Sequence, residues 1–94
     1  MATPDNSIFV GNKPFMNYVT AVVMQFTTKN AEKVIVKARG KFISKAVDVA
    51  EVASKRFLDN IVESDVKIDS EEFKNEEGKD IRVSSIEITL AKKM

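Results

Sequence analysis

The chain has 94 residues, which is enough for one domain and too few for two ordinary cores. Apolar residues make up 44% and charged residues 31%, a balance that excludes both a disordered polypeptide and a membrane protein. The chain has no cysteine and no histidine, so thiol nucleophiles, thiolate metal sites and the commonest general base are missing. The composition therefore argues against an enzyme and predicts no cofactor or metal ion.

No apolar run approaches the roughly 18 residues that a membrane-spanning helix needs. The opening residues, MATPDNSIFVGNK, also lack the basic segment and apolar stretch of a secretory signal. We therefore expect a cytoplasmic protein with no membrane contact. Residues 1–94 are expected to form a single domain, with residues 1–6 as a disordered tail.

The net charge of +1 conceals an uneven distribution. Residues 11–45 carry seven basic residues and one acidic residue, whereas residues 46–78 carry four basic and ten acidic residues. Such an asymmetry is typical of a face that binds a polyanion. The alternative at this point is that the charges simply solvate the surface.

Hydrophobic periodicity predicts strands and helices that alternate through the first two thirds of the chain. Residues 8–10 form a short apolar run that predicts a buried strand, and residues 14–28 predict an amphipathic helix that begins at Pro14. Residues 32–38 are rich in β-branched side chains and predict a second strand, buried on both faces. Residues 41–58 predict the second helix.

The last third of the chain predicts a long β-hairpin. Residues 66–70 alternate apolar and polar side chains, as a half-exposed strand does, and residues 75–78 form the turn. Residues 81–91 predict the returning strand. The apolar residues change parity along this strand, which predicts a bulge or a bend near Ser84–Ser85.

The order βαβαββ predicts an α/β fold of the α+β two-layer type. Two helices cover one face of a mixed four-stranded sheet, and the C-terminal hairpin forms a long arm. Apolar side chains fill close to half the circumference of the second helix, which is more than packing on one sheet needs. This surplus predicts contact with another chain, and the alternative is a larger contact with the first helix.

The residues that could act in catalysis do not form an active site. Tyr18, Ser44, Asp48 and Glu51 could serve as a nucleophile or an acid, but none has a histidine or cysteine partner. The acidic residues of the predicted hairpin lack the spacing of a calcium-binding loop and fit a solvated hairpin. The sequence therefore predicts no catalytic residue and no metal ligand.

Basic residues gather around two junctions between strands and helices. Lys13 follows the first strand, and Lys37, Arg39, Lys41 and Lys45 surround the junction of the second strand with the second helix. Because parallel strands end at the same edge of a sheet, both junctions project from one edge, where helix N-termini also favour phosphate oxygens. Basic side chains there neutralise phosphates without reading base sequence. The pattern predicts a module that binds polyanions.

Three blocks of sequence stand out: VGNKPFMNYV at residues 10–19, KARGKFISKAVD at residues 37–48 and RVSSIEI at residues 82–88. In the same order and at matching separations they resemble the motifs "hGxKPhMNYV", "KARGxxISkAVD" and "RVSxIEI" of the Alba family of archaeal chromatin proteins. The likeness covers about residues 7–92. It implies the βαβαββ fold, a homodimer that binds double-stranded DNA and RNA, and a role in compacting the chromosome.

The resemblance also implies which residues bind. Lys13 matches the family's nucleic-acid-contacting lysine in the first loop. Arg39, Lys41 and Lys45 match basic residues before and within the second helix, and Arg82 matches a basic position on the hairpin arm. With the neighbouring lysines, the predicted nucleic-acid-binding residues are Lys13, Lys37, Arg39, Lys41, Lys45, Lys74, Lys79 and Arg82. Phe57 matches an aromatic residue used in packing between dimers, and the predicted dimer or dimer–dimer interface comprises Phe57, Leu58 and Val49.

The sequence departs from the family pattern in two places. The family's commonest opening has two consecutive lysines, of which the first can be acetylated in some members; here Asn12 takes that position and leaves Lys13 as the candidate target. The predicted hairpin is acidic, so we expect weaker binding than in strongly basic members. Its acidic residues are Glu71, Glu72, Glu76 and Glu77.

The sequence as a whole predicts a non-enzymatic, homodimeric protein of Alba type. It is expected to bind double-stranded DNA largely without sequence preference, to package and compact the chromosome in the cytoplasm, to assemble further on DNA, and to bind RNA. Two alternatives stay open. One is a module for structured RNA, which the low net charge favours, and the other is an assembly protein that docks a protein partner through its acidic half.

Overall fold

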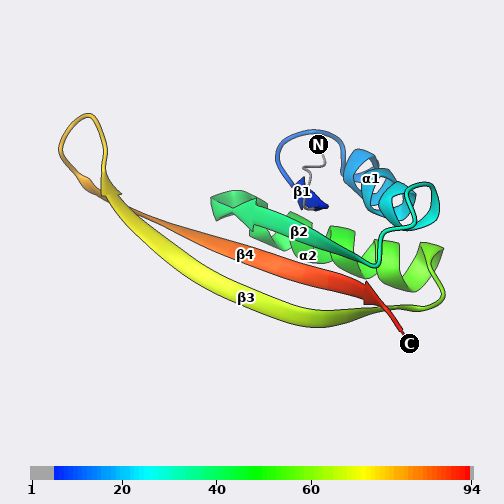
Figure 1. The fold of residues 1–94 in the computed structure, drawn as a ribbon. Helices are drawn as coiled ribbons and strands as arrows, with labels where there is room; N and C mark the ends of the chain where they lie inside the picture. The colour runs from blue at the N-terminus through cyan, green and yellow to red at the C-terminus, as the bar shows by residue number, and fades with distance from the viewer. Residues whose placement is uncertain (1–5, 94) are drawn as a thin grey trace.

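The computed structural model describes residues 6–93, and within them the elements follow the predicted order βαβαββ (Figure 1). The strands and helices are β1 (Ser7–Phe9), α1 (Phe15–Thr27), β2 (Lys33–Arg39), α2 (Ile43–Val52), β3 (Ile61–Lys74) and β4 (Asp80–Lys92). Of the tail predicted over residues 1–6, residues 1–5 lie outside the described residues. The backbone carbonyl of Asn6 accepts a hydrogen bond from the Ile35 N–H at 3.1 Å.

The second helix is extended at both ends by turns of a different geometry. A 3₁₀ turn, η1 (Gly40–Phe42), leads into α2, and a π-helical turn, η2 (Ala53–Phe57), follows it. The whole helical segment therefore runs over residues 40–57, close to the predicted 41–58. Gly40 has a φ of 57°, a left-handed conformation that side chains disfavour, and it makes the change of direction out of β2.

Within the described chain the strands form one mixed sheet in the order β1-β2-β4-β3. β1 runs parallel to β2, and β4 pairs antiparallel with β2 on one side and β3 on the other. Both helices cover the same face of this sheet, and the β3–β4 hairpin extends well beyond them (Figure 1). The predicted two-layer architecture with a long hairpin is confirmed.

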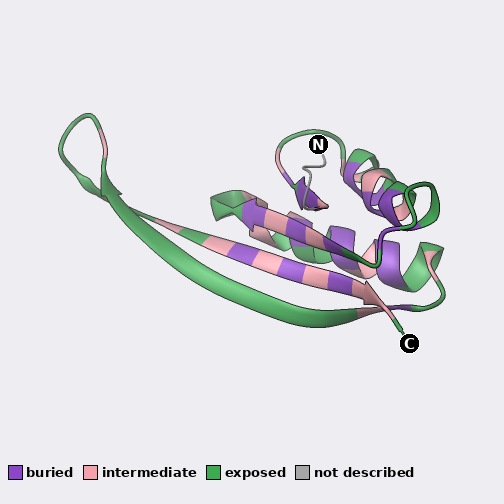
Figure 2. Ribbon diagram, in the orientation of Figure 1, coloured by how far each residue is buried: buried purple, intermediate pink, exposed green. Residues whose placement is uncertain are grey.

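The core lies between the helices and alternate residues of the two central strands (Figure 2). The strands contribute Val34, Val36, Ala38, Ile86, Ile88 and Leu90. The helices contribute chiefly Tyr18, Val19, Val22, Phe26, Ala46, Val49 and Ala50. A fully buried valine or leucine stabilises the fold by about 1.5–3 kcal/mol relative to an exposed one, so this single layer of contacts dominates the stability.

β2 is not buried on both faces, and that prediction is wrong. Its alternate residues Val34, Val36 and Ala38 are buried, whereas Ile35 and Lys37 between them are only half-buried. The reason is that both helices cover one face of the sheet, and no described element forms a layer over the other. A β-branched run thus marks a central strand here without marking a doubly covered one.

β3 is longer and more exposed than the predicted half-exposed strand over residues 66–70. It spans Ile61–Lys74, and Val66 and Ile68 are 52% and 79% exposed. The last residue of β2, Arg39, pairs with Ser85, so residues 70–84 extend past the edge of β2 as a two-stranded ribbon. We call residues 70–84 the arm, and it gives the chain its long dimension of 48 Å.

Of the bulge or bend predicted near Ser84–Ser85, the bulge is not found there. Ser84 and Ser85 pair in regular register with Ser70 and Asp69, and the irregularity lies on the opposite strand, between Glu63 and Asp65. The change of parity in β4 needs no bulge, because the strand leaves the helices there and neither of its faces meets the core. The turn predicted over residues 75–78 is present, with Gly78 at a φ of 80°.

Replacing Gly40 by alanine is expected to destabilise the protein by about 1–2 kcal/mol, because a side chain disfavours a left-handed backbone by that amount. Gly11→Ala is the matched control: its new Cβ would meet the Tyr18 hydroxyl at 3.5 Å, an ordinary contact. The free energy of unfolding measured in urea should separate the two variants. Equal values would contradict the role assigned to Gly40.

Candidate nucleic-acid interface

The carboxyl ends of β1 and β2 meet at one edge of the sheet. Their parallel register pairs Phe9 with Lys37, and the Val10 N–H donates to the Lys37 carbonyl at 2.8 Å. The loop that carries Lys13 therefore lies beside the turn into the second helix, as predicted from the strand order. We call the five basic residues at this edge the basic rim: Lys13, Lys37, Arg39, Lys41 and Lys45.

Residues 11–13 form a loop that is tied to both helices. The Tyr18 hydroxyl of α1 accepts hydrogen bonds from the backbone N–H groups of Gly11 at 3.0 Å and Lys13 at 3.1 Å. From α2, the Lys45 ammonium donates to the Gly11 carbonyl at 2.8 Å and to the Lys13 carbonyl. The same ammonium lies 5.2 Å from the centre of the Tyr18 ring. The structure thus places Lys45, a predicted phosphate contact, half-buried behind the loop.

The ammonium groups of the other lysines of the basic rim donate to no backbone carbonyl within residues 6–93. Lys13 is exposed, and no hydrogen bond or ion pair joins its ammonium to another residue within 6–93. The Lys37 and Lys41 ammonium groups each lie 5.4 Å from the centre of an aromatic ring, that of Phe9 and Phe42 respectively. A ring face attracts a cation without neutralising it, so both groups are held near the edge with their charge intact.

Both helices begin at this edge without a capping side chain. Pro14 before α1 and Arg39 before η1 make no side-chain hydrogen bond to the first turn, and neither first turn contains an acidic residue. Unpaired N–H groups and the positive end of the helix dipole both favour anions. The basic rim therefore combines side-chain charge with two helix starts that suit phosphate oxygens.

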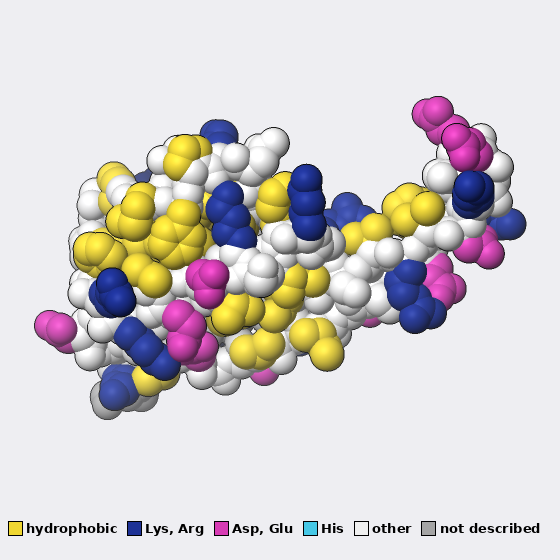
Figure 3. All heavy atoms as spheres, turned by 180° about the vertical axis from the view of Figure 1, so that it is seen from behind, with side chains coloured by type: hydrophobic (Ala, Val, Ile, Leu, Met, Phe, Trp, Pro, Cys, Tyr) yellow, Lys and Arg dark blue, Asp and Glu magenta, His cyan; other side chains and the backbone are white. Residues whose placement is uncertain are grey.

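Arg39 and the basic residues of the arm are ion-paired with acidic residues of the arm. The pairs are Arg39–Glu71 at 3.1 Å, Lys74–Asp80 at 3.7 Å, Lys79–Glu77 at 4.0 Å and Arg82–Glu72 at 3.1 Å from Nε to Oε1. All eight side chains are more than half exposed, so each pair is worth less than about 1 kcal/mol. Acidic and basic side chains accordingly lie interleaved toward the tip of the arm (Figure 3).

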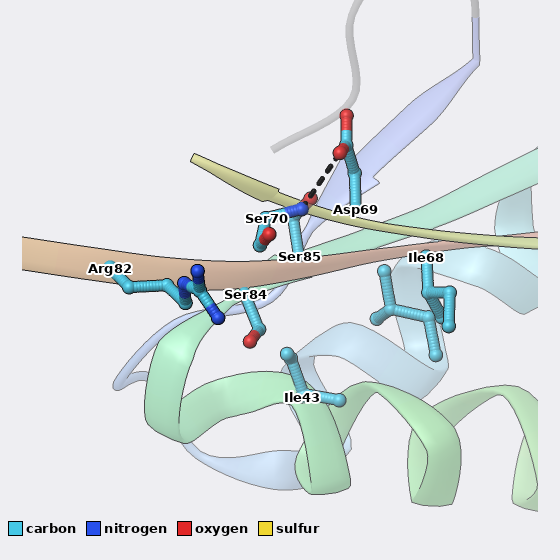
Figure 4. A pocket seen from close by; sticks show the side chains of 8 residues that line it. Ile43, Ile68, Asp69, Ser70, Arg82, Ser84 and Ser85 are labelled. Carbon is cyan, nitrogen blue, oxygen red and sulfur yellow. Dashed lines mark hydrogen bonds between the residues drawn. The ribbon is translucent and has the colours of Figure 1, made fainter. Parts of the chain in front are cut away.

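A groove of about 480 Å³ lies where the arm leaves the body (Figure 4). Ile43 of α2 lines one side, and Ile68 and Ile86, which pair across β3 and β4, line the other. Hydrophobic side chains continue from the body onto the base of the arm on this side of the molecule (Figure 3). The other residues that line the groove are polar or charged: Asp69, Ser70, Arg82, Ser84 and Ser85.

The residues predicted for a dimer or dimer–dimer interface lie in different environments. Phe57 at the end of η2 is 53% exposed, and Leu58 is half-buried. Val49 is completely buried in the core, so it offers no surface to another chain and its assignment is corrected. The wide apolar arc of the second helix is therefore used in large part within the chain, against α1, β2 and β4.

The end of α2 away from the basic rim holds a carboxyl pair. A hydrogen bond from Glu63, together with the Lys55 ammonium at 3.0 Å, lowers the pKa of Glu51. The same carboxyl contact, together with partial burial, raises the pKa of Glu63. Carboxylates repel phosphates, so this end is the less suitable one for a polyanion.

Within residues 6–93, neither helix is long and apolar enough to cross a membrane.

Sequence reasoning missed the two contacts that shape the site most. From the sequence, Tyr18 is considered only as a catalytic candidate. Tyr18 lies on the apolar face of α1 and carries a polar hydroxyl. A buried tyrosine hydroxyl usually finds a hydrogen-bond partner, and this could have indicated its contact near the start of the helix. The pairing of Glu71 with Arg39 joins residues 32 apart in the chain. Only the register of the sheet brings them together.

Comparison with known proteins identifies the family. The family model for Alba matches residues 6–69. The chain is 51% identical to the DNA/RNA-binding protein Alba of Methanococcus maripaludis, over 94% of this chain and 99% of the relative. It is 55% identical to the DNA/RNA-binding protein Alba 1 of Archaeoglobus fulgidus, over 95% and 98%. The chain belongs to the Alba family.

Solved structures agree with this assignment. Alba from Thermoplasma volcanium superposes with a TM-score of 0.83 at 54% identity, covering 93% of this chain and all of that one. ALBA1 from Trypanosoma brucei superposes with a TM-score of 0.68 at 23% identity, covering 96% of this chain and 72% of that one, and shows the same fold. The resemblance read from three sequence blocks is confirmed.

Proposed function

We propose that this chain is a non-enzymatic protein that binds double-stranded DNA through the basic rim, largely without sequence preference. The observation that carries the proposal is the convergence of five basic residues and two uncapped helix starts at one edge of the sheet. Such groups meet phosphates and sugars and leave the bases unread. The names of the relatives, DNA/RNA-binding proteins, support the assignment and extend it to RNA.

In the cell this binding would place the protein on the chromosome in the cytoplasm and contribute to packaging and compacting DNA. Structured RNA is the second candidate ligand. Contacts to phosphates suit any duplex, and the relatives are named DNA/RNA-binding proteins. A protein partner for the acidic half is less well supported, since four of the arm's five acidic residues already pair with basic residues of the same chain. Lys13 stays the predicted target for acetylation, and its side chain is exposed.

We also propose a homodimer in which a second copy covers the groove and the exposed side of β3. Val66 and Ile68 are large, exposed apolar residues on one face of this strand. An isolated two-stranded ribbon is marginally stable in water, so the arm gains most from a partner. Phe57, exposed at the end of η2, is then the residue through which dimers would contact one another on DNA.

Lys13→Ala and Arg39→Ala are each expected to weaken binding of a DNA duplex to a similar degree for any sequence. Each should also reduce the slope of log K against log salt by about 0.9 for every phosphate that the variant no longer neutralises. Fluorescence anisotropy across a series of salt concentrations measures both effects, with duplex RNA titrated in parallel. Lys92→Ala is the control, because Lys92 binds Asn30 at 2.8 Å away from the rim. A larger effect from Lys92 would contradict the assigned face.

Glu71→Gln is expected to tighten duplex binding about two- to fivefold, because it frees Arg39 from an ion pair worth a fraction of a kcal/mol. Glu76→Gln removes the same charge from the same arm, and Glu76 makes no ion pair with another described residue. The difference between the two affinities isolates the pairing from the general loss of negative charge. If both variants bind equally, the Arg39–Glu71 pair does not compete with phosphate.

Ile68→Ser is expected to shift the protein from dimer toward monomer without unfolding it, since Ile68 is 79% exposed within one chain. Sedimentation equilibrium measures the shift. Met24→Ser, which changes an exposed apolar residue of α1 that does not line the groove, should leave the dimer intact. A monomeric unaltered protein at micromolar concentration, or a dimer untouched by Ile68→Ser, would contradict the proposed interface.

A further inference from the structure

We infer that Tyr18 and Lys45 form a positioning pair that fixes the backbone of residues 11–13 and so presents the Lys13 side chain to nucleic acid. In this arrangement Lys45 acts through the loop and does not itself contact phosphate. The inference rests on the proposed function of the basic rim. It assigns different roles to two lysines, Lys13 and Lys45, that sequence reasoning treats alike.

The Tyr18 side chain reaches the loop from the core. Tyr18 is 3% exposed, and its hydroxyl oxygen accepts the N–H groups of Gly11 at 3.0 Å and Lys13 at 3.1 Å. A phenol oxygen has two lone pairs, so both are used. The two N–H groups point inward and cannot bind a phosphate, which leaves the Lys13 side chain as the cationic group that residues 11–13 offer to nucleic acid.

Lys45 completes the loop from the other helix. Its ammonium donates to the Gly11 carbonyl at 2.8 Å and to the Lys13 carbonyl, and it lies 5.2 Å from the centre of the Tyr18 ring. An ammonium has three donors and no acceptor, so two carbonyls and a ring face engage it from several sides. A phosphate that approached this half-buried group would compete with those contacts.

Both polar backbone groups of Gly11 and of Lys13 are therefore held, with N–H groups on α1 and carbonyls on α2. Asn12 lies between these two anchored residues. Lys41 lies one helical turn before Lys45, but it is exposed and sits over the Phe42 ring, with no backbone carbonyl as a partner within 6–93. The contrast shows that sequence spacing alone does not separate a binding lysine from a positioning one.

The first test needs no nucleic acid. Tyr18→Phe keeps the buried ring and removes the hydroxyl, so amide hydrogen exchange at Gly11 and Lys13 should accelerate at least about fivefold, the effect of removing one hydrogen bond from each amide. The Thr28 amide, which donates to the Met24 carbonyl at 2.8 Å, is the internal control and should not change. Unchanged exchange at Gly11 and Lys13 would overturn the inference.

The second test is a pair of double-mutant cycles on duplex DNA binding, measured across a series of salt concentrations. Tyr18→Phe, which alters no charge, and Lys45→Met, which keeps the aliphatic stem, should each weaken binding by no more than Lys13→Ala does. In the Lys13→Ala background neither change should weaken binding further or alter the salt slope. The expected coupling follows because all three act through one contact.

Two outcomes of the second test would decide against the inference. If Lys45→Met lowers the salt slope by about another 0.9 in the Lys13→Ala background, Lys45 is itself a phosphate contact. If Tyr18→Phe weakens binding equally with and without Lys13, the hydroxyl does not act through that lysine. Should the unaltered protein bind no duplex at all, the proposed function fails, while the exchange experiment still decides whether Tyr18 fixes the loop.

Discussion

The parallel pairing of β1 with β2 is the constraint on which the site depends. Only three residues of β1 take part, and their register with Ile35–Lys37 brings the carboxyl ends of both strands to the same edge. The loop after β1 and the turn after β2 must then lie side by side. An antiparallel pairing would send the two loops to opposite edges of the sheet and divide the basic residues between them.

The positions of the charged side chains on this protein matter more than its net charge. The net charge is only +1, yet the sheet register brings acidic side chains of the arm onto the basic residues nearest to them. Because these pairs are exposed, water and salt screen them. Either side chain can therefore leave its ion pair for another partner at a small cost in free energy. A phosphate that takes the place of a carboxylate beside Arg39 replaces one anion with another, so affinity depends on the competition between them.

The sequence predicts the element order well because each element has its own period and its own boundary. Pro14 marks the start of α1 and Gly40 the start of the second helical segment, and the arm turns at Gly78. Burial is harder to predict, since a pattern cannot say how many faces a strand will have covered. β2 is expected to be buried on both faces, but only one of its faces is covered. β3 continues far past residues 66–70, whose alternation predicts it.

The site is predictable in composition and only partly in detail, for a related reason. The basic residues, their common edge and the family are all visible in the sequence, whereas Val49 shares one apolar arc with residues that face solvent. Which edge of that arc faces the core depends on the angle at which α2 meets the sheet. The separate roles of Lys45 and Tyr18 depend on distances across the fold, and no spacing along the chain encodes them.

If the protein binds a duplex as proposed, the arm also sets how densely such proteins can occupy a nucleic acid. One chain measures 48 Å along the arm and only 25 by 23 Å across it. At about 3.4 Å per base pair, a chain lying lengthwise would shield about 14 base pairs, whereas one standing across the duplex would shield half as many. The footprint, and with it the mass of protein that saturates a given length of duplex, therefore depends both on orientation and on whether one chain or a dimer occupies the site.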